Sequence, residues 1–192
     1  KLAINIVITT IPAGLIGLLL SDLIENSDFF SSLFTVGAAM GIVGIIMVVI
    51  DKLPHMSNLK DENQLTPGRS LLIGVLQVFA LIPGTSRSGT TIIAGRIAGM
   101  DSESSAEYSF LASIPIMCAV CLKMFLSDTG RAYFIENLNA LFFSNLIAFV
   151  VGLWALRYLL RYLKKPKSLQ TFGWYRIAVS CLVVGTMLIL VA

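Results

Sequence analysis

The residues with the clearest chemical potential lie between Pro83 and Thr91, which read Pro-Gly-Thr-Ser-Arg-Ser-Gly-Thr-Thr. This stretch combines an arginine, several hydroxyl groups and a helix-breaking Pro-Gly pair, while Leu71–Ile82 before it and Ile92–Met100 after it are mostly apolar. The flanking segments carry Arg87 toward membrane depth, where an ionisable side chain is expensive and by default marks a functional site. Backbone that leaves helical geometry at that depth must be buried in protein or line a cavity.

This candidate site is suited to binding an anion. Arg87 presents a planar fork of donors that matches a phosphate or a carboxylate, and it cannot lose its proton at low dielectric. The helix start after the Pro-Gly break offers unpaired N–H groups and a positive dipole end. We predict as catalytic residues Arg87, Ser86 and Ser88, and as substrate-binding residues Gly84, Thr85, Arg87, Gly89, Thr90 and Thr91. In the alternative interpretation, Arg87 pairs with a carboxylate or with helix carbonyls, and the hydroxyl groups only bond back to the helix.

Composition identifies the chain as an integral membrane protein. Of its 192 residues, 56% are hydrophobic and 13% are charged, and the mean hydropathy is +0.85, so one soluble core could not hide the apolar surface. The net charge of +3 is too small for a nucleic-acid footprint. A window of about 20 residues, the length that crosses the hydrocarbon core, predicts an all-α protein with five transmembrane helices. They cover Leu2–Leu20, Ser31–Ile50, Tyr108–Leu126, Leu141–Leu160 and Trp174–Ala192.

The remaining apolar segment, Ser70–Met100, is broken in its middle by Pro83 and Gly84. At a rise of about 1.5 Å per residue, each half reaches only about 15 to 20 Å. Two short halves that meet at a polar tip predict a re-entrant helix-loop-helix, which enters and leaves on one side. We therefore predict a single polytopic membrane domain over residues 1–192. It comprises two spans and a cytoplasmic loop in 1–69, the re-entrant hairpin with a phosphate-binding tip in 70–100, and three spans in 101–192.

The charges of the loops favour the re-entrant path. The segment Arg157–Lys167 holds five basic residues and no acid, so the positive-inside rule places it in the cytoplasm. Counting back through the spans puts 127–140 outside and 101–107 inside. A re-entrant hairpin keeps the loop 51–69, with Lys52, Lys60 and Arg69, in the cytoplasm and the acidic loop 21–30 outside, whereas a full crossing would reverse both.

Two further patterns predict local packing. Gly37, Gly41 and Gly44 form a small-residue face, which packs against another helix either within the protomer or across a homodimer. Glu107 follows Ser104 by three residues just before an apolar run, which is the pattern of a capping box at a helix start. A role for Glu107 in supporting the candidate site is the alternative.

Four sequence stretches together resemble one known family. They are Gly74-Val-Leu-Gln77, Pro83–Gly89, Ala106–Phe110 and Ile114-Pro115. In this order they are similar to the second signature region of the undecaprenyl-pyrophosphate phosphatase family of the BacA type. The resemblance implies a multi-pass protein of the bacterial cytoplasmic (inner) membrane, built from inverted repeats that each contribute a re-entrant hairpin. It also implies removal of the terminal phosphate from an isoprenoid pyrophosphate lipid, which serves peptidoglycan and cell-wall synthesis and confers bacitracin resistance.

The same resemblance assigns roles to residues of this chain. Arg87 would hold the pyrophosphate, with Ser86, Ser88 and Thr90 as neighbouring contacts. Gln77 would stand where the other repeat has a glutamate.

The family's first signature region has no counterpart in this sequence. Because the chain opens at Lys1 without a methionine, we expect the first hairpin to lie upstream. A divalent cation, Mg²⁺ or Ca²⁺, would then be held by ligands in that hairpin, with no metal ligand in this chain. His55, the one histidine, lies in the polar loop 51–69, and we predict that it is solvent-exposed and not catalytic.

A transporter or flippase of an isoprenoid-phosphate lipid is the alternative function. Broken helices whose N-termini face an anionic substrate near mid-membrane are also the architecture of secondary transporters. The two functions differ in covalent change, because an enzyme releases phosphate and a carrier only relocates its lipid.

Overall fold

The computed structural model describes residues 1–53, 59, 62–165 and 167–191, so His55 lies outside the described residues. The described part is helical and contains no strand. Its helices are α1 (Leu2–Glu25), α2 (Asp28–Ser31), α3 (Leu33–Lys52), η1 (Glu62–Gln64), α4 (Pro67–Gln77), η2 (Val78–Leu81), α5 (Arg87–Ile97), α6 (Ser102–Leu126), α7 (Asp128–Glu136), α8 (Leu138–Leu163) and α9 (Ser168–Val191). Five of them, α1, α3, α6, α8 and α9, are long and apolar enough to cross a membrane, which confirms the predicted all-α membrane fold.

The start of α6 differs from the capping box predicted at Ser104 and Glu107. The N-cap is Asp101, whose carboxylate accepts a hydrogen bond from the backbone N–H of Ser104 at 2.7 Å. An aspartate is a strong N-cap because its oxygen satisfies an N–H group that has no helical partner. The helix therefore begins three residues earlier than the capping box implied, and Glu107 lies inside its second turn.

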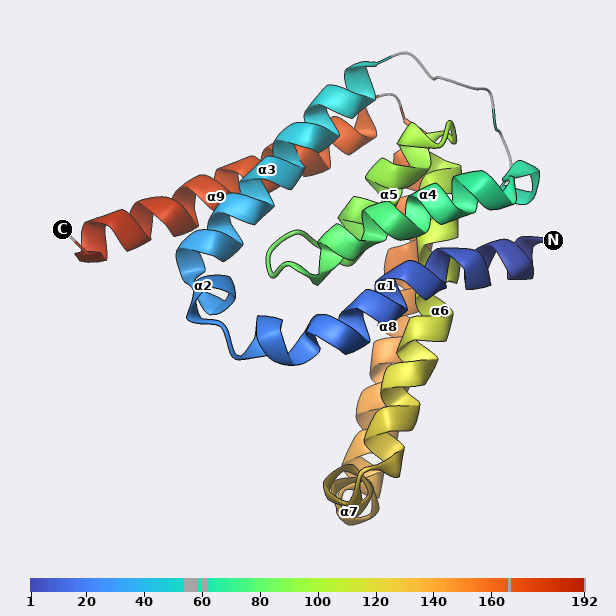
Figure 1. Ribbon diagram of the computed structural model, residues 1–192, viewed down its shortest axis with the longest axis vertical. Helices are drawn as coiled ribbons and strands as arrows, with labels where there is room; N and C mark the ends of the chain where they lie inside the picture. The colour runs from blue at the N-terminus through green and yellow to red at the C-terminus, as the bar shows by residue number, and fades with distance from the viewer. Residues whose placement is uncertain (54–58, 60–61, 166, 192) are drawn as a thin grey trace.

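The glycine face of α3 packs against α9 within the protomer. The two helices lie side by side (Figure 1) and form the most extensive helix pair of the described chain. A Cβ atom added at Gly37 would come within 2.8 Å of Val184, and one added at Gly44 would come within 2.8 Å of the Gly173 carbonyl oxygen. The Ser180 hydroxyl also donates to the carbonyl of Gly37 at 2.7 Å. Small residues thus let the backbones approach closely, and the intramolecular alternative is the one that the structure realises.

The predicted re-entrant hairpin is present as α4, η2 and α5, with its polar turn between η2 and α5 (Figure 1). Thr66 caps the N-terminus of α4, and Pro67 occupies the first turn, where its missing N–H costs nothing. The two ends of the hairpin return to the same place, because Leu65 is packed in one buried cluster with Ala98 and Met100. The segment therefore enters and leaves on one side, as the sequence predicts.

The three loops predicted to be cytoplasmic also meet at one end of the molecule. Lys164, at the end of α8, forms an ion pair with Glu103 in the first turn of α6, with an N–O distance of 2.9 Å. Asp51, near the end of α3, accepts a hydrogen bond from the backbone N–H of Gln170 in α9 at 3.2 Å. These contacts place Asp51, Glu103 and Lys164, one residue from each of the three loops, at the same end of the fold.

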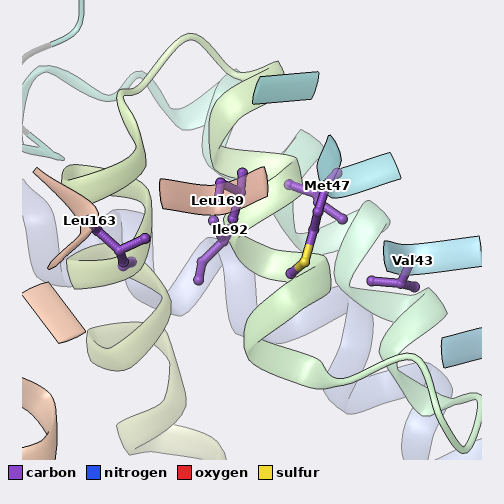
Figure 2. Close-up of a cluster of buried hydrophobic side chains, with 7 residues drawn as sticks. Val43, Met47, Ile92, Leu163 and Leu169 are labelled. Atoms are coloured by element: carbon purple, nitrogen blue, oxygen red, sulfur yellow. The ribbon is translucent and has the colours of Figure 1, made fainter. Parts of the chain in front are cut away.

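A buried apolar cluster connects the long helices to the hairpin (Figure 2). Val43 and Met47 come from α3, Ile92 from α5, Leu163 from α8 and Leu169 from α9, and each is at least nine-tenths buried. Because these side chains come from four different helices, their burial fixes the position of α5 relative to α3, α8 and α9.

A second, polar contact fixes α1 against the hairpin and α6. The Thr9 hydroxyl donates to the carbonyl of Ser70 at 2.9 Å and lies 2.6 Å from the Tyr108 hydroxyl. Tyr108 in turn donates to the carbonyl of Asn5 at 2.9 Å, and its side chain is fully buried. Hydrogen bonds between these buried groups favour one arrangement of the helices that they join.

Candidate functional site

The hairpin turns at Gly84 and Ser86, both of which have positive φ angles. Gly84 has φ +94°, and an added Cβ there would collide with the carbonyl of Val36 on α3. Ser86 has φ +66° and is the N-cap of α5, where a non-glycine residue in this conformation is uncommon. Strain of this kind, about 1 to 3 kcal/mol, persists only where the surroundings hold it and often marks a functional turn.

The Thr85 hydroxyl holds the turn together from inside. It donates to the carbonyls of Ile82 at 2.7 Å and Phe79 at 3.1 Å, and the side chain is buried. Thr85 therefore closes the loop between η2 and α5, and this geometry indicates a structural role for its hydroxyl. Substrate contact by Thr85 stays a prediction.

Thr90 and Thr91 also use their hydroxyls within the chain, as in the back-bonding alternative. Thr90 donates to the carbonyl of Ser86 at 3.0 Å, and Thr91 donates to the carbonyl of Arg87 at 2.8 Å. Thr91 lies in addition 3.4 Å from Oε1 of Gln77, a buried residue at the end of α4. The Thr91–Gln77 contact joins the two halves of the hairpin, so Gln77 holds α5 against α4 and supports the site indirectly.

The start of α5 presents backbone donors at the tip. The first helical hydrogen bond runs from the N–H of Thr90 to the carbonyl of Ser86 at 3.0 Å, and the N–H of Gly89 donates to Oγ of Ser86 at 3.3 Å. The N–H groups of Arg87 and Ser88 precede these bonds, and such groups have no partner within the helix. They add to the positive end of the helix dipole, which attracts anions.

Arg87 brings a cation to this helix start. The side chain is half-buried, and its Nη1 atom is buried without a hydrogen-bond partner among the described residues. Among the described residues, Arg87 forms no ion pair with a carboxylate. The structure therefore does not support the alternative in which Arg87 pairs with a carboxylate. A half-buried cation with a buried donor that has no partner is unfavourable, and a bound anion would relieve this cost.

A second arginine, Arg176 of α9, reaches the same turn. Its Nη2 atom donates to the carbonyl of Gly84 at 2.7 Å and to that of Thr85 at 3.1 Å. Its Nε atom is buried without a hydrogen-bond partner in the described structure. Arg176 thus fixes the turn and adds positive charge beside it.

Arg176, Ser86 and Ser88 line a cavity of about 220 Å³ between α5, α8 and α9. The remaining lining residues are mostly apolar and include Met47, Leu163 and others of the cluster in Figure 2. The Oγ atoms of the two serines are 3.4 Å apart and part of the Ser88 surface is exposed. Arg87 does not itself line this cavity in the described structure. The two serines and Arg176 therefore form a polar corner in an otherwise apolar space.

Most of the chain matches a known family model. The model described as bacitracin resistance protein BacA matches residues 1–182 of this chain. The chain belongs to the BacA family.

Three relatives of this BacA chain are named undecaprenyl-diphosphatase. An undecaprenyl-diphosphatase of Enterococcus faecalis is 35% identical over 94% of this chain and 66% of its own length. An undecaprenyl-diphosphatase 1 of Clostridioides difficile is 36% identical over 99% of this chain and 68% of its own length. An undecaprenyl-diphosphatase of Halothermothrix orenii is 37% identical over 100% of this chain and 70% of its own length. The chain spans about two thirds of the length of these relatives, and their shared name supports the predicted phosphatase function.

Arg176 is the site residue of this BacA chain that sequence reasoning missed. The prediction treated Trp174–Ala192 as a plain apolar span, because an arginine in the first turn of a span can extend its charged group to the membrane interface at little cost. The position of Arg176 in the sequence therefore gave only a weak signal. The target of Arg176 could not be read from the sequence, because Gly84 lies 92 residues away.

Glu107 lies in the second turn of α6, close to Lys164 at the end of α8. Its charge acts on Lys164, which is hydrogen-bonded to Glu103 near the ends of α6 and α8. The Glu103 hydrogen bond raises the pKa of Lys164, and the nearby charge of Glu107 acts in the same direction. A supporting role for Glu107 at the phosphate site stays a prediction.

Proposed function

We propose that this BacA chain carries the phosphate-holding tip of an undecaprenyl-diphosphatase, which hydrolyses the terminal phosphate of undecaprenyl pyrophosphate to give undecaprenyl phosphate. The observation that carries the proposal is the half-buried Arg87 at the N-terminus of α5, with a buried Nη1 atom that has no partner in the described structure. Phosphoryl transfer spreads negative charge over the oxygens of the transferred group, and catalysis depends on positioned positive charge.

The residues of the tip have different roles in binding and positioning the phosphate. Arg87 and the free N–H groups at the start of α5 bind the phosphate oxygens and stabilise the charge that develops on them. Arg176, Thr85 and Gln77 hold the turn in place through the hydrogen bonds described above. Ser86 and Ser88 orient the phosphate from the polar corner of the cavity. Over the whole reaction, a water oxygen forms a new bond to the terminal phosphorus as the bond from this phosphorus to the bridging oxygen breaks. Undecaprenyl phosphate leaves, and the protons of the water go to the inorganic phosphate and to solvent.

A divalent cation, Mg²⁺ or Ca²⁺, is part of the proposal but does not enter these steps. The described residues contain no group of three histidine, cysteine, aspartate or glutamate side chains that could hold a metal ion. The tip therefore does not fit a cation by itself. Loss of phosphate release on chelation, and its recovery with added Mg²⁺ or Ca²⁺, would support a cation requirement.

The setting of the reaction is proposed on the same basis. Five apolar helices make this a multi-pass membrane protein, and we place it in the bacterial cytoplasmic membrane, where the basic segment Arg157–Lys167 faces the cytoplasm. A homodimer is a further proposal, which size measurement in detergent tests. The glycine face of α3 is not available to it, because α9 covers that face.

The experiment that tests the function is phosphate release from undecaprenyl pyrophosphate by the purified full-length protein, supplied with divalent cation. The proposal expects inorganic phosphate and undecaprenyl phosphate in equal amounts. Binding of the intact lipid by folded protein without phosphate release would contradict the enzyme and favour the transporter.

A further inference from the structure

A charged cavity of about 450 Å³ lies at the end of the fold where Asp51, Glu103 and Lys164 meet. Its volume is within the range of about 300 to 1,000 Å³ that is typical of small-molecule sites. The basic side chains that line it are those of Arg96, Lys164, Lys165 and Lys167. The cavity lies at the ends of the membrane-spanning helices α3, α6 and α8, so we expect it at the level of the lipid headgroups on the cytoplasmic side.

The acidic side chains of the cavity are already engaged within the chain. The backbone N–H of Gln170 donates to Asp51, that of Ser104 donates to Asp101, and Lys164 forms the ion pair with Glu103. Lys165 and Lys167 are exposed, and no carboxylate of the described chain forms an ion pair with either of them. These two ammonium groups are therefore available to an anion from outside the protein.

The end of α8 adds positive charge beside the cavity. Arg157 and Arg161 are both exposed, and their spacing of four residues puts them on one face of the helix. The charge of Arg161 also acts on Lys164. Because the segment Arg157–Lys167 contains no acidic residue, this surface has a surplus of positive charge.

An aromatic ladder on α8 leads to the same cavity. The rings of Trp154 and Tyr158 are stacked with their centroids 6.1 Å apart, and Tyr162 stacks on Tyr158 at 6.4 Å. Nζ of Lys165 lies 5.6 Å from the centroid of the Tyr162 ring, so the ladder ends at the charged cavity. Trp154 is 71% exposed and Tyr158 is 64% exposed. The ladder therefore offers hydrocarbon chains an exposed aromatic surface at a depth where membrane proteins place such rings.

We propose that the cavity and the ladder bind an anionic phospholipid of the cytoplasmic leaflet. Its phosphate contacts Lys165 and Lys167, and an acyl chain lies against Trp154 and Tyr158. The occupant follows from charge complementarity, because basic clusters at the cytoplasmic end of a transmembrane helix attract anionic lipids. A lipid with a choline headgroup brings its own cation, so the lysines gain much less from it. A soluble anion can use the lysines but not the ladder.

The test measures lipid contact at Trp154 in the full-length protein, reconstituted in vesicles of phosphatidylcholine. Bromine atoms on an acyl chain quench the fluorescence of a tryptophan that they touch, and the contribution of Trp154 is the difference between the protein and its Trp154→Phe variant. We expect brominated phosphatidylglycerol to associate about tenfold more strongly than brominated phosphatidylcholine. The double variant Lys165→Gln/Lys167→Gln should lower this preference to about twofold or less.

A matched double variant separates the site from a general effect of net charge. Lys123→Gln/Arg131→Gln removes two exposed basic residues from the end of α6 and from α7, and it should keep the preference for phosphatidylglycerol. Equal association of the two lipids with the wild type, or an unchanged preference in Lys165→Gln/Lys167→Gln, would overturn the lipid site. An equal loss in both double variants would also overturn it. Release of brominated phosphatidylglycerol by inorganic phosphate would assign the lysines to a soluble anion instead.

The outcome is independent of the proposed phosphatase function. The lining of the cavity contains neither Arg87 nor the two serines of the hairpin tip, and quenching is measured without substrate. Loss of phosphate release would contradict the enzyme and leave the lipid site standing, whereas loss of lipid preference would do the reverse.

Discussion

Replacing Arg176 tests whether a residue remote in sequence positions the phosphate-binding turn. In Arg176→Ala the turn loses two hydrogen bonds from one guanidinium, to the carbonyls of Gly84 at 2.7 Å and Thr85 at 3.1 Å. Bonds to charged groups contribute about 1.5 to 3 kcal/mol each, and relaxation of the turn and entry of water recover part of that. The turn keeps the internal hydrogen bonds of Thr85, so we expect displacement of the tip and not unfolding.

The expected cost is therefore about 2 to 4 kcal/mol of transition-state stabilisation, a fall in kcat/KM of about thirtyfold to a thousandfold. Arg176→Lys keeps the charge without the planar fork and should lose less than the alanine variant. The assay is phosphate release from undecaprenyl pyrophosphate in detergent, with Tm measured on the same samples. Arg157→Ala, which removes an exposed arginine from α8, is the matched control. A kcat/KM for Arg176→Ala within about threefold of wild type would refute the positioning role.

Three further changes test other parts of the structure. Gly84→Ala should abolish most activity and lower Tm, because the positive φ and the contact with α3 leave no room for a Cβ; wild-type activity would contradict the geometry of the turn. Tyr108→Phe should destabilise the protein by about 1 to 3 kcal/mol, measured by denaturant unfolding, because it removes the buried hydroxyl that contacts Thr9. Glu103→Gln should leave Tm unchanged near neutral pH, because the ion pair with Lys164 is exposed. Glu103 raises the pKa of Lys164, so any stability that the ion pair contributes is present at neutral pH and is lost as the pH rises through the pKa of Lys164 in the folded protein. A large fall in the Tm of Glu103→Gln at neutral pH would contradict the small contribution expected of this exposed ion pair.

The membrane fold was predictable because its signals are local. Hydrophobic runs separated by charged loops set the five long helices, and Pro83 with Gly84 marked the break in the hairpin. The helix boundaries were harder to predict, because an N-cap depends on one side chain. With Asp101 as its N-cap, α6 begins at Ser102, six residues before the predicted span at Tyr108. The short helix α7 was missed inside the loop 127–140, since its composition is too polar for a membrane span.

The candidate site was predictable only in part. The cost of Arg87 at membrane depth located the tip, and helix geometry supplied its backbone donors. The contact from Arg176 depends on how α9 packs against α3, which no local pattern encodes. The same holds for Thr91 and Gln77, which meet only because the hairpin closes. The sequence allowed the threonine hydroxyls to bind either an anion or the carbonyls of their own helix, and the structure shows that they donate to the carbonyls.

The central claim is that the guanidinium of Arg87 holds the phosphate at the hairpin tip. The most direct measurement is kcat/KM for phosphate release from undecaprenyl pyrophosphate by the full-length protein and by Arg87→Ala and Arg87→Lys. We predict a fall of about a hundredfold or more in both variants, or about 2.7 kcal/mol, at a Tm close to that of wild type. Activity in Arg87→Lys within a fewfold of wild type would show that a point charge suffices, and retained activity in Arg87→Ala would contradict the account.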